Sequence, residues 1–433
     1  MSILDFLVPA SEACLRSGPH DKIVLSSRVR LARNLRTSPF PSHSKKAERI
    51  KAFETLMPAV KSLTQLGSET FSESMDKLPA LDKQVLVERH LISREHAAKN
   101  AGSGIVLNRE ENVCVMVNEE DHLRMQALRP GLQLRQAWMA IDAVDTALQE
   151  KVEFAYTERY GFLTACPTNL GTGIRVSAML HLPGLVLAEQ INQIIQAVNK
   201  LGLAVRGLYG EGTEALGNVF QVSNQMTLGE PENDIVERIN KVLLQIIEHE
   251  ENARLSQMEK KPAVLLNHIG RAYGVLGNSW SISSKEAMNL ISFLRLGVDL
   301  AVFGQTPKSL TDELFLRSQP AHLQLAHPLR EKLGSDERDL FRAQMLRERT
   351  ALIPKPDPQA LLGRREPGSP EYGDTERVAL ICPKGGSERP SSGFSEHAHQ
   401  RGRSCLGCYN EFGPSGPDFA PVMGKQVIRL NST

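Results

Sequence analysis

Hydrophobic and polar residues alternate in three different patterns along the chain, and the pattern changes near residues 255 and 352. Up to residue 255, short β-branched runs alternate with helical stretches. The run Val113–Val117 is short, rich in valine and followed by a polar turn, which predicts a buried strand. Residues 204–209 have a similar character and predict a strand that leads into a glycine-rich loop.

A long helix is predicted near the end of this first zone. Apolar residues recur there with the 3.6-residue period of a helix, and Asn233 or Asp234 is the candidate N-cap just after Pro231. Charged residues occupy the opposite face, so we expect the helix to pack on one side only and to close the first domain or bridge to the second. The apolar positions are Ile235, Val236, Ile239, Val242, Leu243, Ile246 and Ile247.

The two later zones differ from the first and from each other. Residues 256–351 have a helical pattern, which predicts a second, helical domain after a first domain over residues 1–255. Residues 352–433 hold 10 of the 24 prolines and 11 of the 32 glycines. Such a composition cannot bury enough apolar area to offset the entropy of ordering, so we expect a mostly disordered tail over 352–433.

Charge and composition narrow the class of protein. Lys plus Arg number 51 and Asp plus Glu number 50, and this net charge of +1 argues against a general nucleic-acid or anionic-membrane binder. No apolar run approaches the length of a membrane span, and the N-terminus lacks the basic and apolar regions of a secretory signal. Six cysteines are too few for a disulfide scaffold. We therefore expect a cytoplasmic protein with reduced thiols.

Five arginines lie at the strand ends and glycine-rich positions of the first zone. Arg28 and Arg30 are two residues apart and would share one face of an extended segment. Arg124 follows an acidic run, Arg175 follows a Gly-Thr-Gly loop, and Arg206 opens a second glycine-rich loop. Planar, permanently charged guanidinium groups suit multidentate phosphate binding, so the set indicates a polyphosphate site. Each arginine taken alone is better explained as an ordinary surface charge.

Acidic residues and one cysteine complete the candidate site. Glu119 and Glu120 directly follow the predicted strand 113–117, and Glu211 and Glu214 belong to the loop after the second strand. A solvated turn is the alternative interpretation of such acidic runs. Cys166 precedes a loop whose backbone could approach an anion, although a lone cysteine is also typical of a core. The sequence contains no Walker motif, no Gly-x-Gly-x-x-Gly and no His-Arg-Asp catalytic loop.

Taken together, these motifs resemble the ATP:guanido phosphotransferases, the family of arginine and creatine kinases and bacterial protein-arginine kinases. Each motif alone is weak, but their joint occurrence in the family's order is highly specific. The matching segments are residues 25–33, 117–124, 166–172, 175–177 and 206–214.

The resemblance also favours one branch of the family, the bacterial protein-arginine kinases. Phosphagen kinases carry a helical domain before the Ser-Ser-Arg-x-Arg motif, whereas here that motif begins at Ser26. We expect a site open enough to accept arginine side chains of whole proteins. Arg338, Asp339, Arg342 and Ala343 match a motif of this branch that binds phosphoarginine allosterically. Because Arg338 and Arg342 are four residues apart on a helix, both guanidinium groups could converge on one phosphate.

For the fold, the resemblance implies an α+β domain with a large, mainly antiparallel sheet flanked by helices, followed by a small helical domain. For catalysis, it implies that Glu120 and Glu214 orient and deprotonate the acceptor guanidinium, with Glu119 and Glu211 as nearby support. The family places catalysis on the second acid of the 119–120 pair. Cys166 matches the active-site cysteine, whose thiolate would pair with the guanidinium.

ATP and Mg²⁺ are the cofactors that the resemblance implies. Tyr209 departs from the phosphagen kinases, which have arginine at that position, so one phosphate contact differs. The expected nucleotide-binding set is Ser27, Arg28, Val29, Arg30, His90, Arg124, Arg175, Val176, Ser177, Ala178, Met179, Arg206, Gly207, Leu208, Tyr209, Gly210 and Glu211.

The branch further implies a stress-response context, a homodimer, protein substrates, a McsA-type activator and a Clp-type ATPase/protease that receives the modified proteins. Two alternatives stay open, a kinase for free arginine and a phosphoarginine-binding adaptor without catalysis. In the tail, Cys405 and Cys408 form half of a possible zinc site, which Cys382, His397 or His399 would have to complete. A disordered extension is the alternative for that segment.

Overall fold

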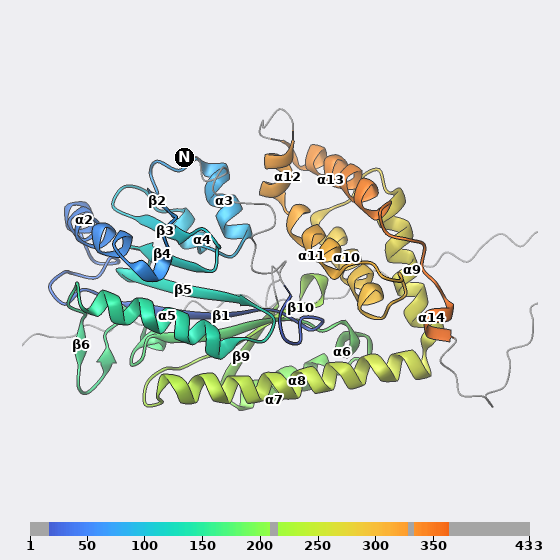
Figure 1. The fold of residues 1–433 in the computed structure, drawn as a ribbon, viewed down its shortest axis with the longest axis horizontal. Helices are drawn as coiled ribbons and strands as arrows, with labels where there is room; N and C mark the ends of the chain where they lie inside the picture. The colour runs from blue at the N-terminus through green and yellow to red at the C-terminus, as the bar shows by residue number, and fades with distance from the viewer. Residues whose placement is uncertain (1–16, 208–214, 328–332, 363–433) are drawn as a thin grey trace, which may run out of the picture. The chain divides into compact units, whose positions relative to one another are not determined.

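The computed structural model describes residues 17–207, 215–327 and 333–362. Its main feature is an eight-stranded sheet in the order β2-β3-β4-β5-β1-β8-β10-β9, in which every neighbouring pair is antiparallel (Figure 1). The large antiparallel sheet that the resemblance implied is confirmed. Its strands are β1 (Val24–Arg33), β2 (Thr70–Ser74), β3 (Gly104–Asn108), β4 (Val113–Val117), β5 (Leu123–Pro130), β8 (Ile174–His181), β9 (Leu203–Gly207) and β10 (Val219–Asn224).

The two faces of the sheet are covered differently. Alternate side chains such as Val29 and Leu31 face one large apolar core beneath five helices. On the opposite face, a second apolar cluster covers β2, β3 and β4, and it ends before the central strand β1. The helices of the first face are α2 (Lys46–Lys61), α5 (Leu134–Gln149), α6 (Pro183–Leu187), α7 (Ile191–Lys200) and α8 (Glu232–Lys260). Those of the second are α3 (Ala80–Glu88) and α4 (Arg94–Ala97).

Both strands predicted from the apolar runs are present. The buried strand predicted over 113–117 is β4, with the same ends. The strand predicted over 204–209 is β9, which begins one residue earlier and is described up to Gly207. Residues 208 and 209 lie outside the described part of the chain.

The predicted amphipathic helix is α8, and all seven of its apolar positions are buried. The predicted N-cap is wrong, because the helix begins at Glu232 with the extended residue Pro231 in the cap position. Asn233 instead accepts a hydrogen bond from the Trp138 indole at 3.0 Å. The acidic residues Glu232 and Asp234 occupy the first turn, where their negative charges interact favourably with the positive end of the helix dipole. The helix continues to Lys260, so the expected domain boundary at 255 falls inside it.

A group of helices follows α8, as predicted for this part of the chain. All of them except α12, whose Ala321 packs with the second cluster, share an apolar core of their own. No helix among the described residues is both long and apolar enough to cross a membrane. The start of the expected tail at residue 352 is wrong, since Ile353 and Leu361 are buried in this core. The part of the tail beyond residue 362 lies outside the described residues. The helices are α9 (Pro262–Asn278), α10 (Ser284–Asp299), α11 (Lys308–Arg317), α12 (Pro320–Ala326), α13 (Ser335–Thr350) and α14 (Gln359–Leu362).

Candidate active site

Five arginines lie on the face of the sheet that the second apolar cluster leaves uncovered. Arg30 is opposite Arg175 in the pairing of β1 with β8, and Arg124 is opposite Ala32 on the neighbouring strand β5. Alternation along β1 places Arg28 on the same face, as predicted from its spacing. Arg206 on β9 is opposite Gln221 of β10, which in turn hydrogen-bonds to Arg28 at 2.8 Å. Strand pairing thus brings together arginines that are far apart in the sequence.

The charges of this arginine cluster are only partly balanced. Burial and the charges of Arg124 and Arg175 lower the pKa of Arg28 to about 10, so it stays protonated at neutral pH. Burial and the neighbouring arginines also lower the pKa values of Arg30 and Arg175. The Nε atoms of these two side chains are buried and have no hydrogen-bond partner among the described residues. A buried surplus of positive charge with unused donors fits a polyanionic ligand such as a nucleotide polyphosphate.

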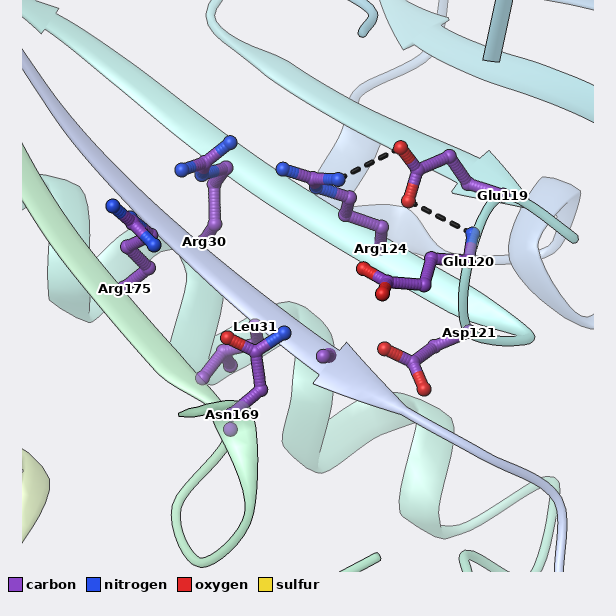
Figure 2. Close-up of a pocket in the computed structure, with 10 residues that line it drawn as sticks. Arg30, Leu31, Glu119, Glu120, Asp121, Arg124, Asn169 and Arg175 are labelled. Carbon is purple, nitrogen blue, oxygen red and sulfur yellow. Dashed lines mark hydrogen bonds and ion pairs between the residues drawn. The ribbon is translucent and has the colours of Figure 1, made fainter. Parts of the chain in front are cut away.

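A recess of about 290 Å³ lies beside these arginines and joins them to the acidic turn (Figure 2). Arg30, Arg124 and Arg175 line one part of it, and Glu119, Glu120 and Asp121 line another. The remaining lining residues are Leu31, Ala32, Asn169 and Gly173. The recess therefore offers an anion-binding surface next to carboxylates, which is the arrangement needed to hold a phosphate beside a cationic acceptor.

Glu119 is a buried structural carboxylate of this turn. It binds Arg124 at 2.7 Å and Ser93 at 2.5 Å through Oε1, and its Oε2 accepts the Glu120 main-chain N–H at 2.9 Å. Burial alone would raise the pKa of Glu119, but the charge of Arg124 and these hydrogen bonds outweigh it and lower the pKa to about 2. Glu119 is therefore ionised and fully engaged in orienting Arg124 and the turn.

Glu120 differs from Glu119 in every one of these respects. Its side chain is exposed and lies between Arg124 and Asp121 at the recess, and it forms no hydrogen bond with any residue in the described ranges (Figure 2). Partial burial and the charges of Asp121 and Glu119 raise its pKa. A carboxylate with unused acceptors and a raised pKa can bind a guanidinium and take its proton. The geometry therefore distinguishes the two acids, which sequence reasoning separated only by resemblance.

Asp121 connects the acidic turn to the loop that carries Cys166. Its Oδ1 accepts hydrogen bonds at 2.6 Å from both the Asn34 side chain and the Ala165 main-chain N–H. Cys166 follows directly, and its sulfur is 3.0 Å from the Thr168 hydroxyl. The thiol is half-exposed. The structure thus places Glu120, Cys166 and the arginines at the same end of the sheet, as expected from the sequence.

Arg33 is a site-building residue that the sequence reasoning missed. It lies an odd number of positions from Arg28 and Arg30 and therefore points to the opposite, apolar side of β1. There it is fully buried, binds Asp145 at 2.6 Å and donates to the Thr172 carbonyl at 2.8 Å. It holds the loop between Cys166 and Arg175 against the sheet. The sequence feature that could have identified Arg33 is its place inside the matched motif 25–33. Its role could not be inferred, because its partner Asp145 is 112 residues away in the sequence.

A second recess, of about 190 Å³, lies on the same face and is lined by residues of the expected nucleotide-binding set. Ser177, Met179, Arg28 and His90 line it, together with Ser26 and Leu128. Burial and the charge of Arg28 lower the pKa of His90 to about 4, so its imidazole is neutral. Apart from the charge of Arg28, this recess is uncharged, and it lies beside the arginine cluster, where the base and sugar of a nucleotide would follow its phosphates.

Four other members of the expected set have side chains on the opposite face, because side chains alternate along a strand. Ser27 is buried and bonds to the Gly131 carbonyl, and the other three belong to the apolar core. Their side chains do not line the nucleotide recess as expected, and only their main chain could face a nucleotide. These core residues are Val29, Val176 and Ala178.

The glycine-rich loop after β9 is described only at its start. Arg206 is exposed on the arginine face, and Gly207 ends the strand. The remaining expected residues of this loop lie outside the described residues, namely Leu208, Tyr209, Gly210, Glu211 and Glu214.

The expected phosphoarginine motif lies on α13. Arg342 is buried, and it donates to the carbonyls of Ser318 at 2.9 Å and Ile282 at 2.8 Å and pairs with Asp339. Arg338 is partly exposed and donates to the Leu333 carbonyl. Ala343 belongs to the helical core. Both guanidinium groups therefore already bind main-chain carbonyls near this face of α13.

Two protein families match this chain. Residues 51–253 match the ATP:guanido phosphotransferase C-terminal catalytic domain, and residues 262–361 match the protein-arginine kinase McsB C-terminal domain. The resemblance inferred from the five motifs is confirmed, and the fold is that of an ATP:guanido phosphotransferase.

The curated relatives narrow this class. The protein-arginine kinase of Halothermothrix orenii is 42% identical over 332 residues, which are 77% of this chain and 94% of the relative. That of Bacillus subtilis is 44% identical over 356 residues, which are 81% of this chain and 97% of the relative. The chain belongs to the protein-arginine kinase family. Among solved structures, the taurocyamine kinase of Schistosoma mansoni with transition state analog components aligns at 26% identity, covering 61% of this chain and 39% of that chain, with a TM-score of 0.49.

Proposed function

We propose that this protein transfers the γ-phosphoryl group of ATP to arginine side chains of proteins. The observation that carries the proposal is the recess in which the uncompensated Arg30 and Arg175 lie beside Glu120, a carboxylate without a partner among the described residues. The activity named for the relatives of similar length supports the choice of protein arginine as acceptor.

In this proposal the arginine cluster holds the phosphates of ATP, and the recess around His90, Ser177 and Met179 holds its base and sugar. Mg²⁺ would enter with the nucleotide and neutralise part of its charge. Within the described ranges, no group of three or more His, Cys, Asp or Glu side chains could hold a metal ion by itself. The ligands of Mg²⁺ would then be mainly phosphate oxygens and water.

Glu120 has the central chemical role. A guanidinium is protonated at neutral pH, so its nitrogen becomes a nucleophile only when a base orients it and accepts a proton. Glu120 can accept two guanidinium N–H bonds and then that proton, while Arg30, Arg124 and Arg175 stabilise the charge on the transferring phosphoryl group. We assign Glu214 as the second carboxylate, Glu211 as its support, and the Cys166 thiolate as a further partner of the acceptor guanidinium.

The wider context is part of the same proposal. We infer a cytoplasmic homodimer that takes part in the stress response, works with a McsA-type activator and delivers modified proteins to a Clp-type ATPase/protease. The match of residues 262–361 to the C-terminal domain of McsB supports this context.

Mass spectrometry under non-acidic conditions tests the activity, because a P–N bond is acid-labile. The protein is incubated with Mg-ATP, a folded protein and free arginine, with Glu120→Gln as the inactive control. Phosphate on protein arginines that is absent from the control is the expected result. Phosphate on free arginine alone would identify a phosphagen-type kinase. No labelling, even with an activator of the McsA type, would favour a phosphoarginine-binding adaptor.

We also propose that Arg338, Asp339, Arg342 and Ala343 bind phosphoarginine and regulate the kinase. Arg338 is the cleaner test of this site, because Arg342 is buried against two main-chain carbonyls and its loss would disturb the fold. Replacing Arg338 by alanine should lower the affinity for free phosphoarginine about tenfold, in keeping with the loss of one charge-assisted contact.

Isothermal titration with phosphoarginine measures this change directly. Replacing Arg317 by alanine is the control, since this partly exposed arginine pairs with Glu313 on α11 and should leave the affinity unchanged. Equal affinity of the parent and the Arg338→Ala protein would exclude Arg338 from the site.

A further inference from the structure

His90, which lines the second recess, has a backbone conformation that is uncommon for a histidine. It follows the end of α3 with a φ of 60°, in the left-handed region where glycine is the usual residue after a helix. The Leu91 main-chain N–H donates to the Leu86 carbonyl at 3.0 Å, which is the closing bond typical of such a helix end. A strained residue of this kind persists only where its surroundings hold it, so the contacts around His90 need an explanation.

The sheet holds the main chain at this bend. Gln126 on β5 is buried, and its Nε2 donates to the His90 carbonyl at 3.0 Å and to the Leu91 carbonyl at 2.7 Å. Gln126 is two residues from Arg124 and therefore lies on the same face of β5. The bend is thus anchored to a strand of the arginine cluster, and the His90 side chain lies at the recess together with Arg28.

The helical region holds the same bend from the other side, because α12 lies beside the end of α3 (Figure 1). Glu88, the last residue of α3, accepts the Ala321 main-chain N–H at 2.8 Å through Oε1. Its Oε2 accepts two hydrogen bonds from His322, at 3.0 Å from the main-chain N–H and at 2.7 Å from Nδ1. The Glu88 and His322 side chains are only 11% and 8% exposed. Three hydrogen bonds therefore join α12 to the residue two positions before His90.

The His322 ring also contacts the residue between Glu88 and His90. Its Nε2 is 3.3 Å from Nε of Arg89, and since a guanidinium only donates, Nε2 accepts and Nδ1 is the nitrogen that donates to Glu88. Arg89 in turn binds the carboxylate of Glu111 at 2.9 and 3.0 Å. One imidazole of α12 thus contacts both residues that precede the bend, and a shift of the end of α3 would break these contacts.

We propose that Glu88 is a positioning residue for the nucleotide: bound to α12, it keeps His90 at the recess. The contact joins the two matched regions of the chain, since Glu88 lies within residues 51–253 and α12 within residues 262–361. The helical region therefore takes part in building the nucleotide site, although none of its residues lines the recess. The inference rests on the nucleotide site of the proposed function and adds a residue outside the recess on which that site depends.

The affinity of the full-length protein for Mg-ADP tests this role, because binding of ADP does not depend on the acceptor. Glu88→Gln keeps the size of the side chain but replaces one acceptor oxygen by an amide N–H₂ that would face the donors of α12. Isothermal titration should show a Kd for Mg-ADP about fivefold higher, the scale of one net hydrogen bond. In the kinase reaction, the KM for ATP should rise by a similar factor while kcat changes less than about twofold.

A double-mutant cycle with His90→Gly tests whether Glu88 acts through His90. Glycine removes the imidazole and is compatible with the φ of 60°, so the bend itself is tolerated. His90→Gly should raise the Kd for Mg-ADP about fivefold or more, the scale of a lost ligand contact. Adding Glu88→Gln to this variant should then raise the Kd by less than about twofold, because the ring that Glu88 positions is gone.

Glu250→Gln is the matched control for a general loss of stability. Glu250 is also buried, and its two oxygens accept the main-chain N–H groups of Gly184 and Leu185 at the start of α6, each at 2.9 Å. Its replacement should lower the melting temperature, as Glu88→Gln does, but leave the Kd for Mg-ADP unchanged. His322→Ala is a second test from the helical region, because it keeps the main-chain bonds to Glu88 and should raise the Kd about threefold.

The outcomes separate this inference from the proposed function. An unchanged Kd in both Glu88→Gln and His322→Ala, or an equal rise in Glu250→Gln, would overturn the inference. An undiminished effect of Glu88→Gln in the His90→Gly background would overturn it as well. A parent that binds no Mg-ADP would overturn the nucleotide site and with it the proposed function, whereas binding without phosphorylation would overturn the proposed activity alone.

Discussion

Replacing Glu120 by glutamine should lower kcat for arginine phosphorylation by about a thousandfold, the scale at which a positioned general base contributes. Glutamine keeps the shape of the side chain but cannot accept the guanidinium proton. Because the Glu120 side chain is exposed and forms no hydrogen bond with the described residues, its replacement should leave the fold and the KM for ATP close to those of the parent. Steady-state kinetics and a thermal melt measure the two effects.

The pH dependence gives a second signature of Glu120. Partial burial and the charges of Asp121 and Glu119 raise its pKa, so the acid limb of kcat/KM should lie above the usual pKa of a glutamate. A carboxyl group with a raised pKa in the folded state stabilises the fold below its unfolded-state pKa. That contribution is lost as the pH rises through the folded pKa. Glu120→Gln should therefore be slightly more stable than the parent at neutral pH.

Glu95→Gln is the matched control for both effects. This exposed glutamate on α4 also raises the pKa of Glu120, although less than its closer neighbours do. Its replacement should move the acid limb slightly toward lower pH and leave the plateau kcat within about twofold, as for a residue outside the reaction itself. Retention of more than a tenth of the parent activity in Glu120→Gln would exclude Glu120 as the base.

The alternation rule explains which parts of the site could be predicted from the sequence. Arg28 and Arg30 are two residues apart, so their common face followed from the extended pattern alone. The same rule, applied to Val176 and Ala178, would have placed their side chains in the core, where the structure has them. The resemblance to the family assigned consecutive residues of its motifs to the nucleotide site. Only alternate side chains of a strand can face a ligand, so the residues between them face the core instead.

What could not be predicted are contacts between distant segments. The pairing of β1 with β8 places Arg30 next to Arg175, 145 residues later, and no local pattern encodes that register. The different roles of Glu119 and Glu120 likewise depend on Ser93, which lies 26 residues before Glu119 and donates to its carboxylate. Glu119 and Glu120 are identical in type and adjacent in sequence, and only their contacts in the folded protein give them different roles.

The second large effect is expected at Glu119, whose replacement by glutamine should cost both stability and activity. The side chain is 1% exposed and its pKa is about 2, compared with an ordinary value of 4.5. A difference of this size corresponds to about 3 kcal/mol of folding free energy at pH 7. The variant also leaves Arg124 without its only carboxylate partner among the described residues. We expect kcat to fall about tenfold to a hundredfold, since Arg124 would no longer be held at the phosphates.

The sign of the pH dependence distinguishes this role from a general packing defect. A group whose pKa is depressed in the folded state stabilises the fold above its unfolded-state pKa, and it loses that contribution as the pH falls through the folded pKa of about 2. The stability difference between the parent and Glu119→Gln should therefore shrink by about half between pH 5 and pH 3, as urea unfolding at each pH would measure.

Glu153→Gln is the control for this comparison, because Glu153 forms an exposed ion pair with Arg36. Its replacement should change the free energy of unfolding by less than about 0.5 kcal/mol at every pH. A Glu119→Gln difference that stays constant from pH 7 to pH 3 would mean that the charge of Glu119 does not stabilise the turn. Packing and neutral hydrogen bonds would then hold the turn. Arg124 would keep its position in Glu119→Gln, and that variant would have near-parent activity.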